Sequence, residues 1–338
     1  MKILLFSYRF FPFVGGIETV SKLVANYLTD RGHEVRVVTT TQSDSNNDLP
    51  YIVLYKPSVI KILKTILWAD VILENNPCLS LSWPLLFIPK RRVTVIHGPL
   101  QEENGKSNAL QRIKKWWVLQ ATRALSCSNE INFRKDKIDT IGNPYQNDIF
   151  KPYSGIKRES DFVFLGRLVS EKGGDLMLEA FASVPNSIRK ESTVTLIGNG
   201  PEYEKLKDLA RQLGIERNIL FKGVLQGEEL ARELHKYRYI LVPSLSREAF
   251  GIVALEGMAC GCVPIVADRC GLEEAVGRFG FTFRRGDSSS LAQMINSVLT
   301  DHEKIRSDSS EIVSHLKQFE VESVCQKYLD TIKNAYVK

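Results

Sequence analysis

The chain alternates between two hydrophobic patterns, and the alternation runs through the sequence twice. Short apolar runs, typical of buried strands in a parallel sheet, are followed by longer segments in which apolar residues recur with helical spacing. In the first half, the sequence predicts strands over 2–7, 34–39, 71–73, 93–97 and 124–126, and a helix over 17–31. This order predicts an α/β protein, in which helices cover the faces of a mostly parallel sheet.

The same alternation restarts at residue 161. In the second half, strands are predicted over 161–165, 193–197, 219–222 and 239–242, and helices over 176–183, 202–213 and 227–237. The joint falls near 142–154, where asparagine, proline and glycine supply turn chemistry. With 338 residues the chain exceeds the usual size of a single core. We expect one domain over 1–150, a second over 151–315, and a final helix, 316–338, that packs back on the first domain.

Composition is that of an ordinary globular protein, with 43% hydrophobic and 25% charged residues. The formal net charge of +6 suits an anionic ligand or an anionic membrane surface. The basic residues are dispersed and form no nucleic-acid-binding motif, so no nucleic-acid partner is expected. No stretch resembles a signal-peptide core or a membrane span, which favours a cytoplasmic protein.

Six cysteines are present, and none forms a C-x-x-C pair. Cys260 and Cys262 flank one glycine beside an apolar run, which favours small buried residues in a reducing compartment over a metal site. We therefore expect no metal.

The most informative segment reads E-A-F-G-I-V-A-L-E and begins at Glu248. A helix is predicted to open at Gly251, and a helix N-terminus attracts an anion. If all the intervening residues were helical, the α-carbons of Glu248 and Glu256 would lie about 12 Å apart. This separation suits opposite ends of one elongated ligand, although a solvated loop glutamate and an exposed helix glutamate would show the same spacing.

Three other loops follow predicted strands and carry candidate residues. Arg167 and Lys172, in G-R-L-V-S-E-K-G-G, could neutralise a diphosphate, or could be solvated charges partnered by Glu171. Gly15 and Gly16 precede a helix and could admit a phosphate or sugar, as many structural turns would also allow. His97 ends the run V-T-V-I-H, where it is either a polar site residue or a satisfied structural histidine. Neither Gly15-Gly16 nor Gly198-Asn199-Gly200 completes the dinucleotide fingerprint.

Together with G-N-G-P and the run that begins G-G-I-E-T-V, these motifs resemble the retaining nucleotide-sugar glycosyltransferases of family 4. The resemblance covers residue 1 to about 277. It implies the GT-B fold, in which two Rossmann-like domains face each other across a cleft, the first on the acceptor side and the second on the donor side.

The resemblance also implies residue roles. Arg167 and Lys172 would hold the donor diphosphate in place of a metal, Glu248 would contact the sugar hydroxyls, and Glu256 the ribose. Phe250 and Gly251 would offer backbone N–H groups, Gly16 would lie beside the diphosphate, and His97 near the transferred sugar. The remaining members of the expected donor set are Gly15, Gly198, Ile252 and Val253.

The implied function is transfer of a sugar from a UDP- or GDP-sugar to a glycan or lipid-linked saccharide, in polysaccharide or glycolipid synthesis, without a metal or other cofactor. An epimerase, a phosphorylase and a silent sugar-nucleotide binder are the alternatives. Where many family members carry H-x-H-x-P, this chain has Leu73-Glu74-Asn75-Asn76-Pro77, so the resemblance does not support an acceptor contact at this motif.

Basic and aromatic residues also gather in the first half. Lys106, Arg112, Lys114 and Lys115 precede Trp116 and Trp117, and residues 83–92 mix apolar side chains with Lys90, Arg91 and Arg92. This composition suits a peripheral membrane contact. A helix that buries its tryptophans in the domain is the alternative.

Overall fold

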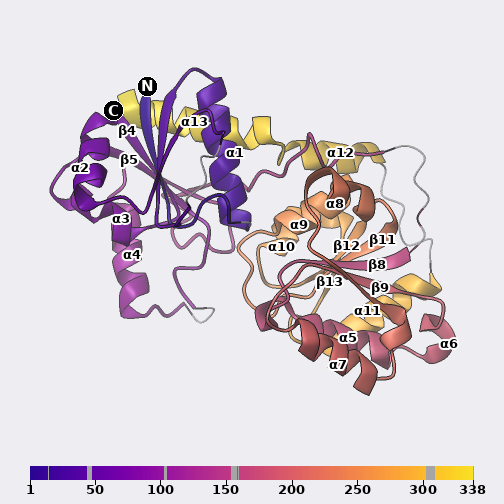
Figure 1. Ribbon diagram of the computed structural model, residues 1–338. Helices are drawn as coiled ribbons and strands as arrows, with labels where there is room; N and C mark the ends of the chain where they lie inside the picture. Colours follow the sequence, from indigo (N-terminus) through magenta and orange to yellow (C-terminus); the bar gives the residue numbers. More distant parts are fainter. Residues whose placement is uncertain are drawn as a thin grey trace. The chain divides into compact units, whose positions relative to one another are not determined.

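The computed structural model describes residues 1–13, 15–43, 48–102, 105–153, 158, 160–301 and 309–337. It divides into two compact units (Figure 1). Unit 1 comprises Met1–Pro144 and Phe319–Lys338, and unit 2 comprises Tyr145–Gln318. The chain therefore passes into unit 2 at Pro144/Tyr145, where the sequence predicted 150/151, and returns at Gln318/Phe319, where it predicted 315/316.

Unit 1 contains a seven-stranded parallel sheet in the order β3-β2-β1-β4-β5-β6-β7. The strands are β1 (Lys2–Ser7), β2 (Glu34–Thr39), β3 (Ile52–Tyr55), β4 (Val71–Asn75), β5 (Arg91–Ile96), β6 (Arg123–Ser126) and β7 (Asp139–Thr140). The helices are α1 (Gly16–Asp30), α2 (Val59–Trp68), α3 (Leu79–Ser82), η1 (Trp83–Leu86), α4 (Ala109–Leu119) and α13 (Val321–Val337). The strand order reverses between β1 and β4, so the loops that follow these strands flank the point where open α/β sheets bind ligands.

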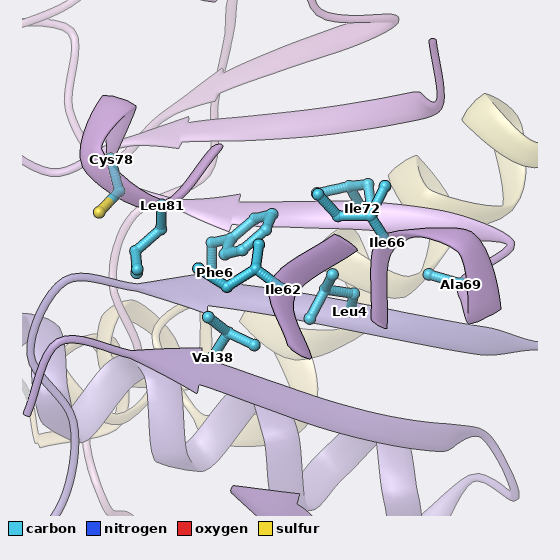
Figure 2. Packing of buried hydrophobic residues seen from close by; sticks show 9 residues of the cluster. All are labelled: Leu4, Phe6, Val38, Ile62, Ile66, Ala69, Ile72, Cys78 and Leu81. Atoms are coloured by element: carbon cyan, nitrogen blue, oxygen red, sulfur yellow. The ribbon is translucent and has the colours of Figure 1, made fainter. Parts of the chain in front are cut away.

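Alternation along the strands distributes the core of unit 1 over both faces of the sheet. On one face, α2 packs Ile62 and Ile66 against Leu4 and Phe6 of β1, within a larger buried cluster (Figure 2). Since successive strand residues point to opposite faces, Ile3 and Leu5 face the other side. There α1 lies on β1 and β2, and α13 lies on β4 and β5.

The last helix, α13, packs against α1. Tyr27 on α1 donates its hydroxyl to Gln326 Oε1 at 2.8 Å, and Arg31 donates to both carboxylate oxygens of Glu322 at 2.6 and 2.8 Å. Tyr328 on the same helix is fully buried. The final residues of the chain thus complete the core of the unit that the first residues begin.

Unit 2 repeats the architecture with a six-stranded parallel sheet in the order β10-β9-β8-β11-β12-β13. The strands are β8 (Ser160–Leu165), β9 (Val194–Ile197), β10 (Ile219–Gly223), β11 (Tyr237–Val242), β12 (Val263–Ala267) and β13 (Phe281–Phe283). The order reverses between β8 and β11. The helices are α5 (Gly174–Ser183), α6 (Asn186–Arg189), α7 (Tyr203–Gln212), α8 (Gly227–Leu234), α9 (Ile252–Ala259), α10 (Leu272–Val276), α11 (Ser288–Thr300) and α12 (Ser309–Lys317), with the short turns η2 (Ser170–Lys172), η3 (Glu216–Asn218) and η4 (Gly277–Phe279).

One predicted helix is three residues too long. The helix predicted over 227–237 ends at Leu234, and Tyr237 begins β11 instead. Tyr237 pairs with Ser160 of β8 and is buried, and its hydroxyl donates to Glu233 at 2.6 Å. Strand pairing and burial therefore override the helical spacing at this position.

Candidate functional site

Three loops meet at the carboxyl end of the sheet in unit 2. They follow β8 (residues 166–173), β11 (residues 243–251) and β12 (residues 268–271). The first two leave the strands at which the order of the sheet reverses. Arg167, Lys172 and Glu248 all lie on these two loops, so the topology brings together residues that the sequence places far apart.

Two glycines allow these loops to touch. Gly173 has φ +70°, and a Cβ there would lie 2.0 Å from the carbonyl oxygen of Pro243. On the other side of the β11 loop, a Cβ on Gly271 would lie 2.0 Å from the carbonyl oxygen of Ala249. Any larger residue would force the loops apart, so these glycines are required by close approach of the backbones.

Backbone hydrogen bonds hold the same loops in place. The N–H of Leu245 donates to the Glu171 carbonyl at 2.9 Å, and the N–H of Gly271 donates to the Glu248 carbonyl at 2.9 Å. The backbone of Glu248 is therefore hydrogen-bonded to the loop after β12. The backbone of Leu245, on the same loop as Glu248, is hydrogen-bonded to the loop after β8.

The Glu248 side chain is paired with Lys172. The ammonium of Lys172 donates to Glu248 Oε1, and the hydroxyl of Ser244 donates to the same oxygen at 2.7 Å. The side chains of Lys172 and Glu248 are 28% and 19% exposed, so the pair remains within reach of a ligand. In the alternative interpretation of the sequence, Glu171 was the predicted partner of Lys172. The structure corrects this prediction, because the sheet topology places Glu248 beside Lys172.

Arg167 lies on the same loop as Lys172 and is exposed. Its guanidinium has no ion-pair or hydrogen-bond partner within the residues that the structure describes. It is therefore available to an incoming anion, which a guanidinium binds through a planar fork.

Helix α9 points its N-terminus at the end of the β11 loop. Its N-cap is Gly251, with φ +114°, where a Cβ would lie 2.3 Å from Leu272 Cδ2. The N–H groups of Gly251, Ile252 and Val253 belong to the first turn and have no carbonyl partner within the helix. Phe250, just before them, is buried.

Glu256 lies on α9 in a different environment from Glu248. It is half-buried, and desolvation raises the pKa of its carboxyl group to about 8. The described part of the chain offers this carboxyl group neither a hydrogen bond nor an ion pair. An unpaired carboxyl group so placed can bind a hydroxyl group of a ligand.

Gly198 directly follows β9 and lies beside the β8 loop. Its φ is +143°, a Cβ there would lie 1.9 Å from the Gly166 carbonyl oxygen, and its own N–H donates to Gly223 at 2.7 Å. Its backbone conformation and packing therefore account for a glycine at this position, and no ligand is needed to explain it.

In unit 1, His97 follows β5 and is buried. Its Nε2 lies 2.7 Å from Asn75 Oδ1, and the hydroxyl of Tyr328 lies 3.4 Å from the same nitrogen. Asn75 Nδ2 donates to Ser21 Oγ at 2.7 Å, and Ser21 is 2.9 Å from Ser7 Oγ. This buried chain of hydrogen bonds links the ends of β1, β4 and β5 with α1 and α13.

The network selects one form of the imidazole. A carbonyl oxygen only accepts, so Nε2 of His97 carries the hydrogen that it donates to Asn75. Burial lowers the pKa of His97 to about 4, with Asn143 acting in the opposite direction, so the ring is neutral at pH 7. Nδ1 is buried and makes no well-formed hydrogen bond within the described part of the chain.

Gly15 and Gly16 lie at the start of α1. Gly16 is the first helical residue, and Gly15 has extended backbone that any residue can adopt. Both follow β1, at the point where the strand order of unit 1 reverses.

The sequence did not identify Ser244, Asn75 or Tyr328. Ser244 follows the end of a strand, where a serine is commonplace, and Tyr328 is 231 residues from His97. No local pattern distinguishes them, because their partners are brought to them by the fold.

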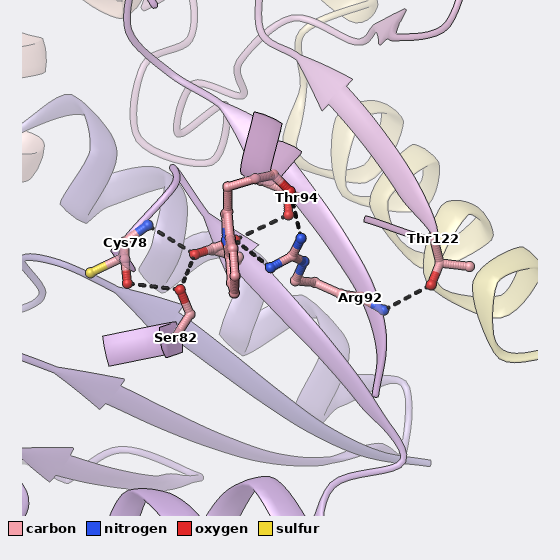
Figure 3. A network of polar contacts seen from close by, with 7 residues as sticks. Cys78, Ser82, Arg92, Thr94 and Thr122 are labelled. Carbon is pink, nitrogen blue, oxygen red and sulfur yellow. Dashed lines mark hydrogen bonds and ion pairs between the residues drawn. The ribbon is translucent and has the colours of Figure 1, made fainter. Parts of the chain in front are cut away.

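A second polar network in unit 1 includes Cys78, Ser82, Arg92 and Thr94 (Figure 3) and surrounds the buried carboxylate of Glu74. Glu74 accepts hydrogen bonds from the backbone of Cys78 and from the side chains of Ser82, Thr94 and Trp117. Arg92 lies 3.9 Å from Glu74 and stacks over the Trp117 ring. The sequence composition predicted that Arg92 and Trp117 lie on a membrane-facing surface. That expectation is wrong for both, because this network buries them.

The outer face of α4 differs from its buried face. Leu110, Ile113 and Trp116 are each more than half exposed, at 56%, 51% and 51%. With Leu119 they recur every third residue, and we call these four residues the α4 ridge. Arg112 on the same helix is exposed.

No described helix is long and apolar enough to cross a membrane. Over the same residues, no group of three or more His, Cys, Asp or Glu side chains is arranged to hold a metal ion. All six cysteines are free and buried.

Comparison with known proteins identifies relatives of unit 2 and of the whole chain. Residues 146–312 match the family model for glycosyl transferases group 1. The chain is 30% identical over 212 residues to a glycogen synthase of Mycobacterium tuberculosis, a match that covers 58% of this chain and 50% of that protein. The N-acetyl-alpha-D-glucosaminyl L-malate synthase of Bacillus anthracis is 22% identical over 363 residues, covering 94% of this chain and 93% of that protein.

Solved structures agree on the fold. Anabaena HepE in complex with UDP and glucose superposes with a TM-score of 0.80 at 20% identity, covering 99% of this chain and 100% of that chain. Sucrose-phosphate synthase from Thermosynechococcus elongatus superposes with a TM-score of 0.82 at 18% identity, covering 99% of each. Residues 146–312, nearly all of unit 2, therefore match the group 1 glycosyltransferases, and the chain has the GT-B fold of two Rossmann-like domains.

Proposed function

We propose that this protein transfers a sugar, with retention of anomeric configuration, from a UDP- or GDP-sugar to a glycan or lipid-linked saccharide in polysaccharide or glycolipid synthesis. The observation that carries the proposal is the cluster of Lys172, Glu248 and exposed Arg167 at the reversal of strand order in unit 2, next to the N-terminus of α9. It combines cations for a diphosphate with a carboxylate for sugar hydroxyls.

In the proposed reaction, negative charge develops on the departing nucleoside diphosphate. Arg167, Lys172 and the first-turn N–H groups of α9 stabilise that charge electrostatically, and loops held by backbone hydrogen bonds need little reorganisation to do so. Glu248 accepts hydrogen bonds from the donor sugar, and Glu256 from the ribose. Retention follows from displacement on the same face, in which the departing phosphate helps to deprotonate the acceptor.

Unit 1 contributes its own residues to the proposal. We assign His97 to the transferred sugar and the loop at Gly15 and Gly16 to the neighbourhood of the diphosphate. Because His97 is neutral, it can form hydrogen bonds with a sugar without carrying charge. The relatives support a sugar nucleotide as donor: HepE has been crystallised with UDP-glucose, and one relative is a GDP-mannose-dependent mannosyltransferase.

We propose that no metal takes part, because two side-chain cations serve the diphosphate. The test is sugar transfer in the presence of EDTA, for which we expect an unchanged rate. Complete loss of activity on chelation, restored by Mg²⁺ or Mn²⁺, would show that the cation pair does not replace a metal.

A panel of UDP-, GDP- and ADP-sugars tests the reaction itself. We expect one of them to release nucleoside diphosphate, and release to rise when a cell lipid or glycan extract supplies the acceptor. An epimerase would convert the sugar nucleotide without any acceptor, and a phosphorylase would require inorganic phosphate. A silent binder would bind a sugar nucleotide and turn none over.

We further propose that the protein works in the reducing cytoplasm, which suits six free buried thiols, and that the α4 ridge contacts the membrane that holds a lipid-linked acceptor. The ridge combines exposed apolar side chains with a basic neighbour, the pairing that an anionic lipid surface attracts.

A further inference from the structure

The two oxygens of the Glu248 carboxylate are used unequally. Oε1 accepts from both the Lys172 ammonium and the Ser244 hydroxyl. Oε2 accepts no hydrogen bond from any residue that the structure describes. A carboxylate can accept about four hydrogen bonds, so one oxygen is occupied by the protein while the other remains available.

Ser244 is unusually well placed to fix this arrangement. Its side chain is fully buried, and its hydroxyl lies 2.7 Å from Oε1. The residue before it, Pro243, contacts Gly173, and the residue after it, Leu245, donates to Glu171. The loop that carries Ser244 is thus locked to the loop that carries Lys172, and the two donors approach Oε1 from fixed positions.

We propose that Ser244 is a positioning residue, which holds the Glu248 carboxylate so that Oε2 is presented to the hydroxyls of the donor sugar. Hydrogen bonds to a carboxylate are stronger than those between neutral groups, so the buried hydroxyl can restrict the side chain to one orientation. The Lys172 ammonium donates to the same oxygen. This ion pair therefore joins the cation that binds the diphosphate to the carboxylate that binds the sugar. This inference rests on the proposed function, because it assumes that Glu248 meets the donor sugar.

A positioning role and a purely structural role make different predictions. If Ser244 only stabilises its loop, its removal should weaken binding of the nucleotide and of the nucleotide sugar alike. If it orients Glu248, binding of the nucleoside diphosphate without the sugar should be unchanged, and only the contribution of the sugar should be lost.

The experiment compares UDP with UDP-glucose by calorimetry on the full chain, or the corresponding pair for the base that the panel selects. For Ser244→Ala we expect unchanged UDP affinity, and binding and transfer of the nucleotide sugar reduced by about 10- to 100-fold, the range for a hydrogen bond to a charged group. Ser192→Ala is the matched control. Ser192 is also buried in unit 2 but precedes β9 at the opposite end of the sheet, and its removal should leave both affinities unchanged.

A double-mutant cycle then tests whether Ser244 acts through Glu248. In the Glu248→Ala background, Ser244→Ala should cause no further loss. An equal loss in both backgrounds, or parallel weakening of UDP and UDP-glucose, overturns the inference while leaving the proposed function intact. Failure of the wild type to bind any nucleotide sugar overturns both.

Two further substitutions apply if Ser244→Ala does not fold. Ser244→Thr keeps a donor hydroxyl and should retain the preference for the nucleotide sugar, whereas Ser244→Cys replaces it with a weak donor and should lose that preference. Equal behaviour of the Thr and Cys variants contradicts the positioning role.

Discussion

Glu248 and Glu256 are eight residues apart in sequence, but they experience opposite surroundings. Glu248 is neutralised by Lys172 and receives a second hydrogen bond from Ser244. Glu256 lacks such partners in the described structure, and burial alone raises the pKa of its carboxyl group to about 8. At the residue scale, the two positions therefore call for different experiments.

For Glu248→Ala we expect a loss of sugar transfer of about 100-fold or more, because a contact with the reacting sugar is removed and the Lys172 charge loses its partner. Initial rates with the preferred donor measure the effect. Glu179→Ala, which removes an exposed glutamate from α5, is the matched control and should transfer sugar normally. A wild-type rate in the Glu248 variant would contradict the assignment of this residue.

Glu256 should make stability depend on pH. Its folded-state pKa is raised above the ordinary value of 4.5, so the unfolded state ionises first as the pH rises. The contribution of Glu256 to the free energy of unfolding should therefore be most favourable below pH 4.5 and should fall between pH 4.5 and about 8. At pH 7 the expected loss is about 3 kcal/mol.

Replacement by glutamine removes this ionisation. We expect Glu256→Gln to raise the Tm more at pH 8 than at pH 5, and to weaken binding of the donor nucleotide. Thermal unfolding at the two pH values provides the measurement. The same change in Tm at both would show that burial does not destabilise the ionised carboxylate.

At the scale of elements, α4 shows how one helix can serve two environments. Its buried face carries Trp117, whose indole N–H donates to Glu74 at 2.8 Å and whose ring stacks under Arg92. Its exposed face carries the α4 ridge. The buried ionic network holds the helix on the sheet and leaves the ridge facing outward.

Co-sedimentation with anionic liposomes tests the proposed membrane contact. We expect Ile113→Glu with Trp116→Glu to reduce binding by at least about 10-fold, because two charges would enter the interface and two apolar anchors would be lost. Val224→Glu, a change at an exposed apolar residue of unit 2, should bind as the wild type does. If the wild type fails to bind anionic liposomes at low salt, the membrane proposal is wrong.

At the scale of the whole molecule, unit 1 is built from both ends of the chain. Residues 319–338 return to it after unit 2 is complete. The side chains of Val324, Tyr328, Leu329 and Ile332 on α13 are buried. At about 1.5–3 kcal/mol for each buried apolar side chain, their contribution is comparable to the whole stability of a domain.

Deletion of residues 319–338 should therefore unfold unit 1 and leave unit 2 folded. Hydrogen exchange measured by mass spectrometry should show loss of protection in β1 and β4, with β8 and β11 still protected. The control Glu322→Ala breaks an exposed ion pair, which contributes little to stability, and should leave protection unchanged. Retained protection of β1 after the deletion would show that α13 is dispensable.

Much of the fold could be predicted because buried strands appear in the sequence as short apolar runs. The strands over 2–7 and 34–39 have the predicted bounds. β3 was missed because Ile52–Tyr55 is an apolar run of only four residues, and periodicity does not distinguish so short a run from a helix segment. The predicted helix end at 237 was wrong because Tyr237 fits both patterns, and pairing with β8 determines its conformation.

The sequence by itself determined the alternation of strands and helices, hence two parallel sheets, and the loops on which Arg167, Lys172 and Glu248 lie. Periodicity is a local property, so it can be read without knowing what lies across the fold. Only the tertiary structure decided the partners. Lys172 pairs with Glu248, 76 residues away, and His97 with Asn75 and Tyr328, because the order of strands in each sheet determines which loop ends become neighbours.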